Sequence, residues 1–231
     1  MGAIYLVRHG QASFGAAEYD ALSALGVEQA TRLGAALKQR GLRVDRVISG
    51  PMRRHRQTAE ACLTAMDLPA VWDEQPGWKE YDHDEMIARF DPRLSDPATR
   101  LAHFAHEPDP RRAFQTMFER ATERWIGGDH DADYAESWPA FNARVSTALR
   151  TLAASMAPSQ NALVFTSGGP VAVVTADLLR VPQRDAARIN RIVANASLTK
   201  VLYSERGLYL STFNEHSYFE GERHKQLITY R

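Results

Sequence analysis

Residues 161–174, with the sequence NALVFTSGGPVAVV, decide the fold of this chain. They predict a buried strand at Ala162–Thr166 and a glycine turn that opens an apolar helix reaching about Leu179. Two more short apolar runs of this kind precede them, Ala3–Val7 and Val44–Ile48. Short apolar runs that alternate with helices are typical of a parallel sheet covered on both faces. The sequence therefore predicts an α/β fold of three layers, α/β/α, with a mostly parallel central sheet.

The segments around these runs predict two more helices and a hairpin. The first helix ends at Gly41 and has apolar residues at helical spacing, namely Leu25, Ala30, Leu33 and Leu37. The second helix follows Pro51 and reaches about Met66. Residues 197–214, SLTKVLYSERGLYLSTFN, alternate as a hairpin does, with a turn at 205–207.

The middle of the chain, from about residue 82 to residue 136, carries no strand signal. Large apolar residues recur there at roughly helical spacing, and they are Phe90, Leu94, Leu101, Phe104, Phe114, Met117, Phe118, Trp125 and Ile126. Prolines at 92, 97, 108 and 110 divide the predicted helices. We predict a mainly helical insertion over the carboxyl end of the sheet, within a single domain that spans residues 1–231.

Composition excludes several classes of protein. The chain carries 28 Lys and Arg against 28 Asp and Glu, so we expect neither broad nucleic-acid binding nor attraction to a membrane surface. No apolar run approaches the ~20 residues that a membrane span needs. The lone cysteine, Cys62, excludes an intrachain disulfide and is expected to pack within a helix. The opening MGAIYLVRHG is apolar too briefly for a signal peptide, so we expect a cytoplasmic protein. The sequence indicates no particular oligomeric state.

Cationic and polar residues follow the predicted strands at the point where each strand ends. Arg8-His9-Gly10 follows the first run, Arg53 and Arg54 lie shortly after the second, and Ser167-Gly168-Gly169 follows the third. In an open α/β sheet, ligands bind beyond the carboxyl ends of the strands. The sequence therefore predicts an anion pocket at this edge, because guanidinium groups pair well with phosphate oxygens.

Six stretches of the chain resemble, in order, the motifs of the histidine phosphatase superfamily, also called the phosphoglycerate mutase-like family. They are YLVRHGQ, YDALSALGVEQATRLG, VISGPMRRHRQTAEA, WKEYDHDE, ESWPAFNARV and NASLTKV. The resemblance extends from residue 3 to about residue 215, and it implies the same α/β fold. Only Arg54 matches the arginine of the third stretch, so Arg53 and Arg56 are expected to face solvent.

The resemblance also implies roles for particular residues. His9 would be the nucleophile that becomes phosphohistidine, and a neutral imidazole suits this role near pH 7 because its reference pKa is ~6.5. Arg8 and Arg54 would bind the phosphate, and Glu80 would be the general acid that protonates the leaving oxygen. Three nearby carboxylates could compete with Glu80 for that role, namely Asp82, Asp84 and Glu85.

The glycine turn after the third predicted strand departs from the family pattern. The resemblance aligns Ser167 with a histidine that the family places there. A serine can donate one neutral hydrogen bond to phosphate but no charge, and the Gly168 amide at a helix start would add to the anion site. Either His83 or His216 could compensate for the missing histidine, or catalysis is impaired. Two smaller departures remove polar contacts, Ala12 and Gly15.

These observations favour a phosphatase that hydrolyses a small phosphomonoester through phosphohistidine on His9. The alternatives are a phosphoglycerate mutase-like phosphotransferase and a catalytically impaired protein that only binds a phosphorylated ligand. Ser167 is not expected to be a nucleophile, since FTSGG lacks the glycine two positions earlier that a nucleophile elbow needs. The acidic stretch 127–137 lacks calcium-loop spacing, and we expect no metal and no organic cofactor.

Overall fold

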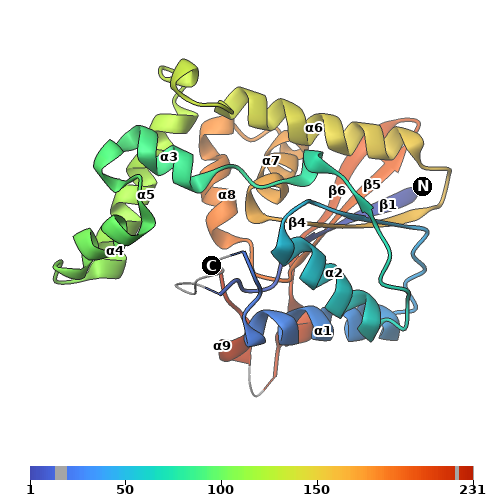
Figure 1. Ribbon diagram of the computed structural model, residues 1–231. Helices are drawn as coiled ribbons and strands as arrows, with labels where there is room; N and C mark the ends of the chain where they lie inside the picture. The colour runs from blue at the N-terminus through green and yellow to red at the C-terminus, as the bar shows by residue number, and fades with distance from the viewer. Residues whose placement is uncertain (14–19, 222–223, 231) are drawn as a thin grey trace. The chain divides into compact units, whose positions relative to one another are not determined.

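A mixed sheet of six strands forms the centre of the computed structural model, which describes residues 1–13, 20–221 and 224–230 (Figure 1). The side chains of Gln183, His224 and Lys225 are not described. The strands are β1 (Gly2–Arg8), β2 (Arg46–Ser49), β3 (Asp73–Glu74), β4 (Asn161–Thr166), β5 (Leu198–Ser204) and β6 (Gly207–Glu215). Their order is β3-β2-β4-β1-β5-β6. The first four strands in this order are parallel to one another, β5 is antiparallel to β1, and β6 is antiparallel to β5.

The chain divides into two compact units, and the sheet belongs to the first, Met1–Glu80 with Val145–Arg231. The helices of this unit are α1 (Ala24–Gln39), α2 (Arg53–Ala65), α7 (Gly168–Leu179), α8 (Ala186–Ile192) and α9 (His224–Leu227). The second unit, Tyr81–Arg144, contains α3 (His83–Phe90), α4 (Pro97–Ala105) and α5 (Pro110–Ile126). Helix α6 (Trp138–Ser155) begins in the second unit and ends in the first.

The three predicted strands and the hairpin are confirmed, with one error in a strand boundary. Strand β2 begins at Arg46 and not at Val44, because Asp45 forms hydrogen bonds with Asn161 that differ from the regular strand pairing. Asp45 N donates to Asn161 O at 2.9 Å, and Asp45 Oδ2 accepts from Asn161 N at 2.8 Å. Asp45 therefore ties the start of β2 to the start of β4, and regular pairing begins one residue later.

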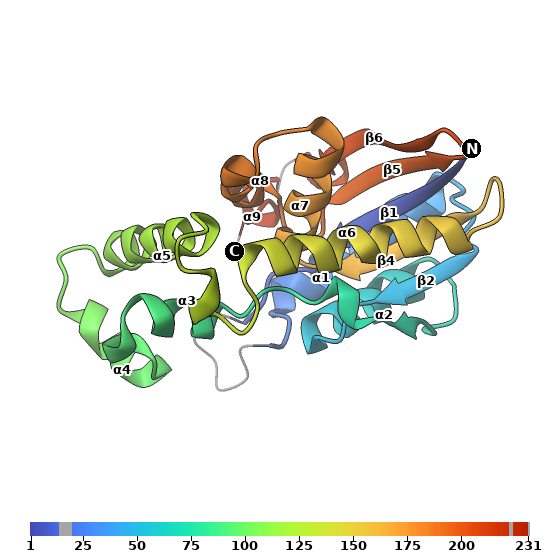
Figure 2. The same cartoon turned by 90° about the horizontal axis from the view of Figure 1, so that it is seen from above.

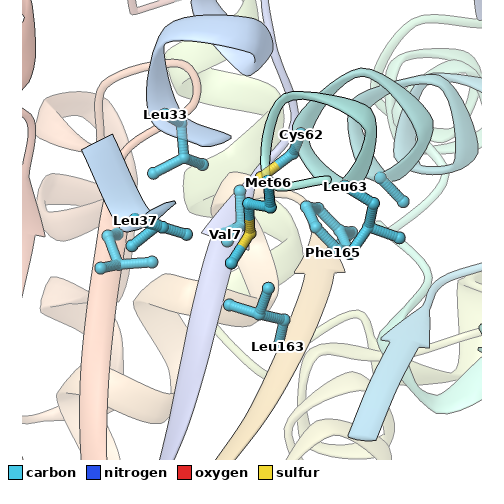
Figure 3. Close-up of a cluster of buried hydrophobic side chains, with 10 residues drawn as sticks. Val7, Leu33, Leu37, Cys62, Leu63, Met66, Leu163 and Phe165 are labelled. Atoms are coloured by element: carbon cyan, nitrogen blue, oxygen red, sulfur yellow. The ribbon is translucent and has the colours of Figure 1, made fainter. Parts of the chain in front are cut away.

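Helices α1 and α2 cover one face of the sheet. Side chains alternate along each strand, so Val7, Leu163 and Phe165 point to this face. They pack against a stripe of buried residues from the two helices, Leu33, Leu37, Ala59, Cys62, Leu63 and Met66 (Figure 3). Burial raises the pKa of Cys62 to about 12, so its thiol stays protonated and serves as a packing group, as predicted.

Helix α7 covers the opposite face, which completes the three layers (Figure 2). Leu6 and Val164 point to this face and are fully buried. Every residue of α7 from Gly168 to Ala176 is buried, which is the pattern of a helix enclosed on all sides. The glycine turn therefore lies at the start of an interior helix, where its backbone amides are shielded from water.

The second unit is mainly helical, and it includes the segment of about 82–136 for which the sequence carries no strand signal. Asp96 and Asp109 cap α4 and α5 through backbone amides of the first turn, and a proline occupies the first position of each helix. A small core holds the unit together, formed by Ile87, Leu94 and Phe104 with Ala113, Phe114, Met117 and Phe118 packed against them. Among the described residues, no helix has the length and apolar character to cross a membrane.

Candidate active site

The carboxyl ends of three parallel strands meet at one edge of the sheet. Arg8 pairs with Thr166 and Ser49 pairs with Phe165 in register, so β1, β2 and β4 end at the same level. His9 N continues the pairing by donating to Thr166 O at 2.8 Å. The sequence-predicted residues of the first unit therefore gather around His9.

His9 is a buried and neutral imidazole. The residue is 6% exposed, and Nδ1 lies 2.7 Å from Gly10 O. Burial, followed by the charges of Arg54 and Arg8, holds the pKa of His9 well below its usual value of 6.5. A carbonyl only accepts hydrogen bonds, so Nδ1 carries the ring proton and Nε2 presents its lone pair. Nε2 is therefore the unprotonated nitrogen of the His9 ring.

The backbone around His9 is fixed from several sides. Gly10 N donates to Thr58 Oγ1 at 3.1 Å, and that hydroxyl donates to Arg54 O at 2.6 Å. On the other side, His9 O accepts from Ala196 N and from Asn195 Nδ2, both at 3.1 Å. These bonds join the loop after β1 to α2 and to the segment before β5. Thr58 and Asn195 therefore support the site, and both lie within stretches that carry the family resemblance.

A glycine is required directly after His9. A Cβ built on Gly10 would lie 2.3 Å from Gly26 O, in the first turn of α1. Backbone atoms cannot yield at that distance, so any other residue would push α1 away from the loop. This close approach keeps the loop and the start of α1 in one rigid piece.

Arg54 lies in the first turn of α2 and is 3% exposed. Its Nη1 donates to Asp20 Oδ1 at 3.0 Å, while Asp20 Oδ2 accepts from Arg53 N at 2.8 Å. No described residue accepts a hydrogen bond from the buried Nε of Arg54. Part of this guanidinium is therefore available to an anion beside His9. Arg53 and Arg56 are exposed, as predicted.

Arg8 is also buried beside His9, but its guanidinium is largely engaged by backbone carbonyls. Nη1 donates to Val193 O, and both Nη1 and Nη2 donate to Tyr230 O at 3.2 Å. The Tyr230 segment is held by Gln29, whose Nε2 donates to Leu227 O at 2.7 Å. Arg8 thus supplies charge close to His9, and its orientation depends on residues near position 230.

Glu80 reaches the glycine turn. It is 5% exposed, and Oε2 accepts from Gly169 N at 3.1 Å. The preceding segment is anchored by Thr166, whose Oγ1 donates to Trp78 O at 2.7 Å. The Gly169 amide is therefore used by Glu80, which leaves the Gly168 amide as the predicted anion contact. A Cβ built on Gly168 would lie 3.5 Å from Arg8 Nε, so this glycine lies beside the guanidinium of Arg8.

The three carboxylates that could compete with Glu80 have local partners in the second unit. Asp82 caps α3 by accepting from Asp84 N and Glu85 N, both at 3.0 Å. Asp84 forms an ion pair with Arg100 at 2.7 Å, and Glu85 accepts from Ala135 N at 2.8 Å. These contacts account for all three carboxylates by structural roles.

Ser167 contacts a histidine that the sequence reasoning missed. Its Oγ lies 2.6 Å from Nε2 of His55, which is fully buried on α2. The His55 ring centroid is 5.8 Å from that of His9. Burial first, and then the charge of Arg54, hold the pKa of His55 well below its usual value.

The two histidines proposed as substitutes, His83 and His216, each have neighbours within their own unit. His83 packs on Tyr81 and Phe118 within the second unit, with ring centroids 4.3 and 5.7 Å away. His216 Nδ1 lies 2.6 Å from Asn214 O, at the end of β6. The histidine that packs against His9 is His55, and its position was visible in the helical period of α2. Arg54, His55, Thr58, Ala59 and Cys62 form one buried stripe.

Ala12 and Gly15 are the two smaller departures from the family pattern. Ala12 forms an isolated antiparallel bridge with Leu22, while Gly15 lies outside the described residues. In the part of the chain that the structure describes, no group of three or more His, Cys, Asp or Glu side chains is arranged to hold a metal ion.

Comparison with known proteins identifies the family. The sequence model of the histidine phosphatase superfamily (branch 1) matches residues 4–216. The chain belongs to this superfamily. A search of curated proteins finds no match to this chain.

Several solved structures share the fold of this chain. Phosphoglycerate mutase from Bacillus anthracis str. Sterne is 21% identical, with a TM-score of 0.64 over 94% of each chain. Mycobacterial glucosyl-3-phosphoglycerate phosphatase in complex with inorganic phosphate is 21% identical, with a TM-score of 0.62 over 94% of this chain and 99% of that one. A phosphoserine phosphatase variant from Entamoeba histolytica, in complex with phosphoserine, is 15% identical, with a TM-score of 0.60 over 93% of this chain and 97% of that one.

Proposed function

We propose that this protein is a phosphatase that hydrolyses a small phosphomonoester through a phosphohistidine on His9. One observation carries the proposal, namely a buried, neutral imidazole whose Nδ1 is held by Gly10 O beside two buried arginines. A neutral imidazole with a free Nε2 lone pair is a nucleophile at neutral pH. Buried cations next to it favour a phosphoryl group over a neutral electrophile.

In the first step, His9 Nε2 attacks phosphorus while the bond from phosphorus to the ester oxygen breaks. Arg54 and Arg8 stabilise the charge on the phosphoryl oxygens, since preorganised cations act where charge develops. Glu80 donates a proton to the leaving oxygen, which departs as an alcohol. Because Gly169 N holds Oε2 at 3.1 Å, the other carboxyl oxygen of Glu80 is assigned the proton.

In the second step, water attacks the phosphorus of phosphohistidine. The Glu80 carboxylate takes a proton from the water, and the bond between nitrogen and phosphorus breaks. Inorganic phosphate leaves, and both His9 and Glu80 return to their starting states. Each step therefore balances with water as the second reactant, and no metal or organic cofactor takes part.

Solved structures of similar fold support a small phosphorylated substrate. Their names include a glucosyl-3-phosphoglycerate phosphatase with bound phosphate and a phosphoserine phosphatase with bound phosphoserine. A phosphoglycerate mutase has the same fold, so transfer of the phosphoryl group to a second hydroxyl is the main rival. A mutase differs in one chemical requirement, because it must keep water from phosphohistidine.

The decisive experiment combines a substrate panel with trapping of the intermediate. Purified protein is assayed for phosphate release from sugar, amino-acid and glycerate phosphomonoesters, and is quenched after brief mixing with labelled substrate. We expect phosphate release from at least one ester and an acid-labile label on the wild type but not on His9→Ala. Equal labelling of His9→Ala would contradict the mechanism. Labelling with transfer but no release would identify a mutase, and binding without either would identify a ligand-binding protein.

A further inference from the structure

Residues 227–230 lie far from His9 in the sequence, yet they are hydrogen-bonded to the side chains that hold its loop. Two amide side chains make these bonds, Gln29 from α1 and Asn195 from the segment before β5. Both residues are fully buried, so their polar atoms need partners inside the protein. The bonds of these two amides therefore tie residues 227–230 to the site.

Gln29 joins this segment to the residues that follow His9. Its Nε2 donates to Leu227 O at 2.7 Å and to Thr229 Oγ1 at 2.9 Å, which uses both amide hydrogens. Its Oε1 accepts from Gln11 N at 2.8 Å. An amide engaged on both its donor and its acceptor side has one orientation. The position of Gln11, two residues after His9, is therefore tied to that of Thr229.

Asn195 joins the same segment to His9 itself. Its Nδ2 donates to His9 O at 3.1 Å, and its Oδ1 accepts from Thr229 Oγ1 at 2.9 Å. A hydroxyl has one proton, so Thr229 Oγ1 donates to Asn195 and accepts from Gln29. A chain of hydrogen bonds thus runs from His9 O to Gln11 N through three side chains, Asn195, Thr229 and Gln29.

We infer that Thr229 is a positioning residue for phosphoryl transfer, whose hydroxyl holds Asn195 and Gln29 so that the loop carrying His9 stays fixed. The inference rests on the proposed function, because it takes His9 Nε2 as the attacking atom. Attack needs Nε2 in line with the bond that breaks, and a misplacement of about 1 Å can cost ~10²-fold in rate. Thr229 acts through the two amides, and its contribution belongs to the chemical step.

A second link from the same segment does not use the Thr229 hydroxyl. Tyr230 O accepts from Nη1 and Nη2 of Arg8, both at 3.2 Å, and Thr229 O accepts from Asn195 N at 2.8 Å. Both links end on backbone carbonyls, so they remain when only the hydroxyl is removed. Arg8 should then keep its orientation and its charge beside His9. Loss of the hydroxyl should therefore slow phosphoryl transfer and leave anion binding nearly unchanged.

Thr229→Val tests this division, because valine keeps nearly the same shape and lacks the hydroxyl. Labelling of His9 in a single turnover with a labelled phosphomonoester should be roughly tenfold slower than in wild type. The inhibition constant of sulfate, used as a phosphate mimic, should stay within about threefold of the wild-type value. Thr229→Ser keeps the hydroxyl and should restore the labelling rate. If valine prevents folding, Thr229→Ala removes the same hydroxyl and should show the same loss.

A matched control separates this role from the loss of any internal hydroxyl. Thr175 is buried on α7, and its Oγ1 donates to Val171 O at 2.8 Å within the helix. Thr175→Val should therefore label His9 at the wild-type rate. Hydrogen exchange followed by mass spectrometry adds a readout that needs no substrate. Residues 9–11 should exchange faster in Thr229→Val than in wild type, Thr229→Ser or Thr175→Val, because Gln11 N depends on the Gln29 amide.

The outcomes separate this inference from the proposed function. Equal labelling rates in wild type and Thr229→Val would overturn the role of Thr229, and so would a loss confined to sulfate binding or unchanged exchange at residues 9–11. A slow Thr229→Ser protein would also overturn it, since the hydroxyl would then not be the cause. In each of these cases phosphohistidine on wild-type His9 would leave the proposed phosphatase intact. A wild-type protein that forms no phosphohistidine with any ester would overturn both proposals.

Discussion

Arg54 offers the sharpest test of the site, because its removal should change both the rate and its pH dependence. Arg54→Met keeps most of the buried side-chain stem but removes the guanidinium. Its known partner, Asp20, is 44% exposed on its side chain, so water can replace the lost contact. A half-exposed ion pair contributes about 0–1 kcal/mol, and we expect only a small loss of folding stability.

The expected kinetic loss is much larger than the loss of stability. Removal of one preorganised donor from an oxyanion site costs about 2.7–4 kcal/mol, which is roughly 10²–10³-fold in kcat/KM. Arg54 is also the foremost charge that lowers the pKa of His9, second only to burial. Without Arg54, that pKa should rise toward 6.5. In the proposed mechanism the neutral form of His9 is the nucleophile, so the acid limb of kcat/KM should move to higher pH in the variant.

The assay is kcat/KM from pH 4.5 to 8 on a phosphomonoester that the panel identifies. Arg53→Met is the matched control, since Arg53 is the preceding residue of the same helix turn and its side chain is exposed. The control should keep the wild-type rate and acid limb. Thermal unfolding of each variant shows whether the fold is retained. A folded Arg54→Met protein with a rate within threefold of wild type, or an unmoved acid limb, would refute the assignment of Arg54.

Two more predictions follow from Glu80 and from the buried histidines. Glu80→Gln should slow hydrolysis of an alkyl phosphate by about 10²–10⁴-fold and an activated aryl phosphate much less, because a good leaving group needs little protonation; equal losses would move the role of acid elsewhere. His9 and His55 have folded-state pKa values well below 6.5, so the unfolded chain binds more protons as the pH falls. Between pH 7.5 and 5.5 the ligand-free protein should lose up to about 1.4 kcal/mol of unfolding free energy for each histidine, measured with urea, and His55→Gln should lose about half as much as wild type. A stability that is flat over this range, or an unchanged slope in the variant, would show that these rings are not buried as neutral groups.

The strands and the nearest site residues were predictable because their signals are local. An apolar run of five or six residues followed by glycine specifies a buried strand and its end, wherever the partner strands lie. The residues just after such runs, including His9 and Ser167, must then gather at one edge of a parallel sheet. The strand ends also placed Arg53 and Arg54 at this edge, and the family resemblance then selected Arg54 and added Glu80, which no spacing rule connects to His9.

The remaining contacts of the site depend on distant parts of the chain. The carbonyls that hold Arg8 belong to Val193 and Tyr230, and nothing near residue 8 in the sequence indicates them. His55 was different, because the helical period of α2 indicated its buried position, but the three neighbouring arginines drew attention to charge instead. The charges at positions 53, 54 and 56 suggested a solvated helix start, whereas the period of the buried stripe placed His55 on the inner face.

The position of β1 in the sheet has a consequence for synthesis of the protein. β1 is synthesised before the other strands of the sheet, yet its partners in the part of the chain that the structure describes are β4 and β5, which start at Asn161 and Leu198. The apolar segment from Ile4 to Val7, which is largely buried in the folded protein, therefore has no partner strand until β4 and β5 have been synthesised. Nascent chains that stall before β5 would expose this segment and lack one of the two strands that pair with β1, which His9 directly follows. Folding should thus be late and dominated by contacts between distant residues, and we expect nascent chains to depend on holdase chaperones until β5 emerges.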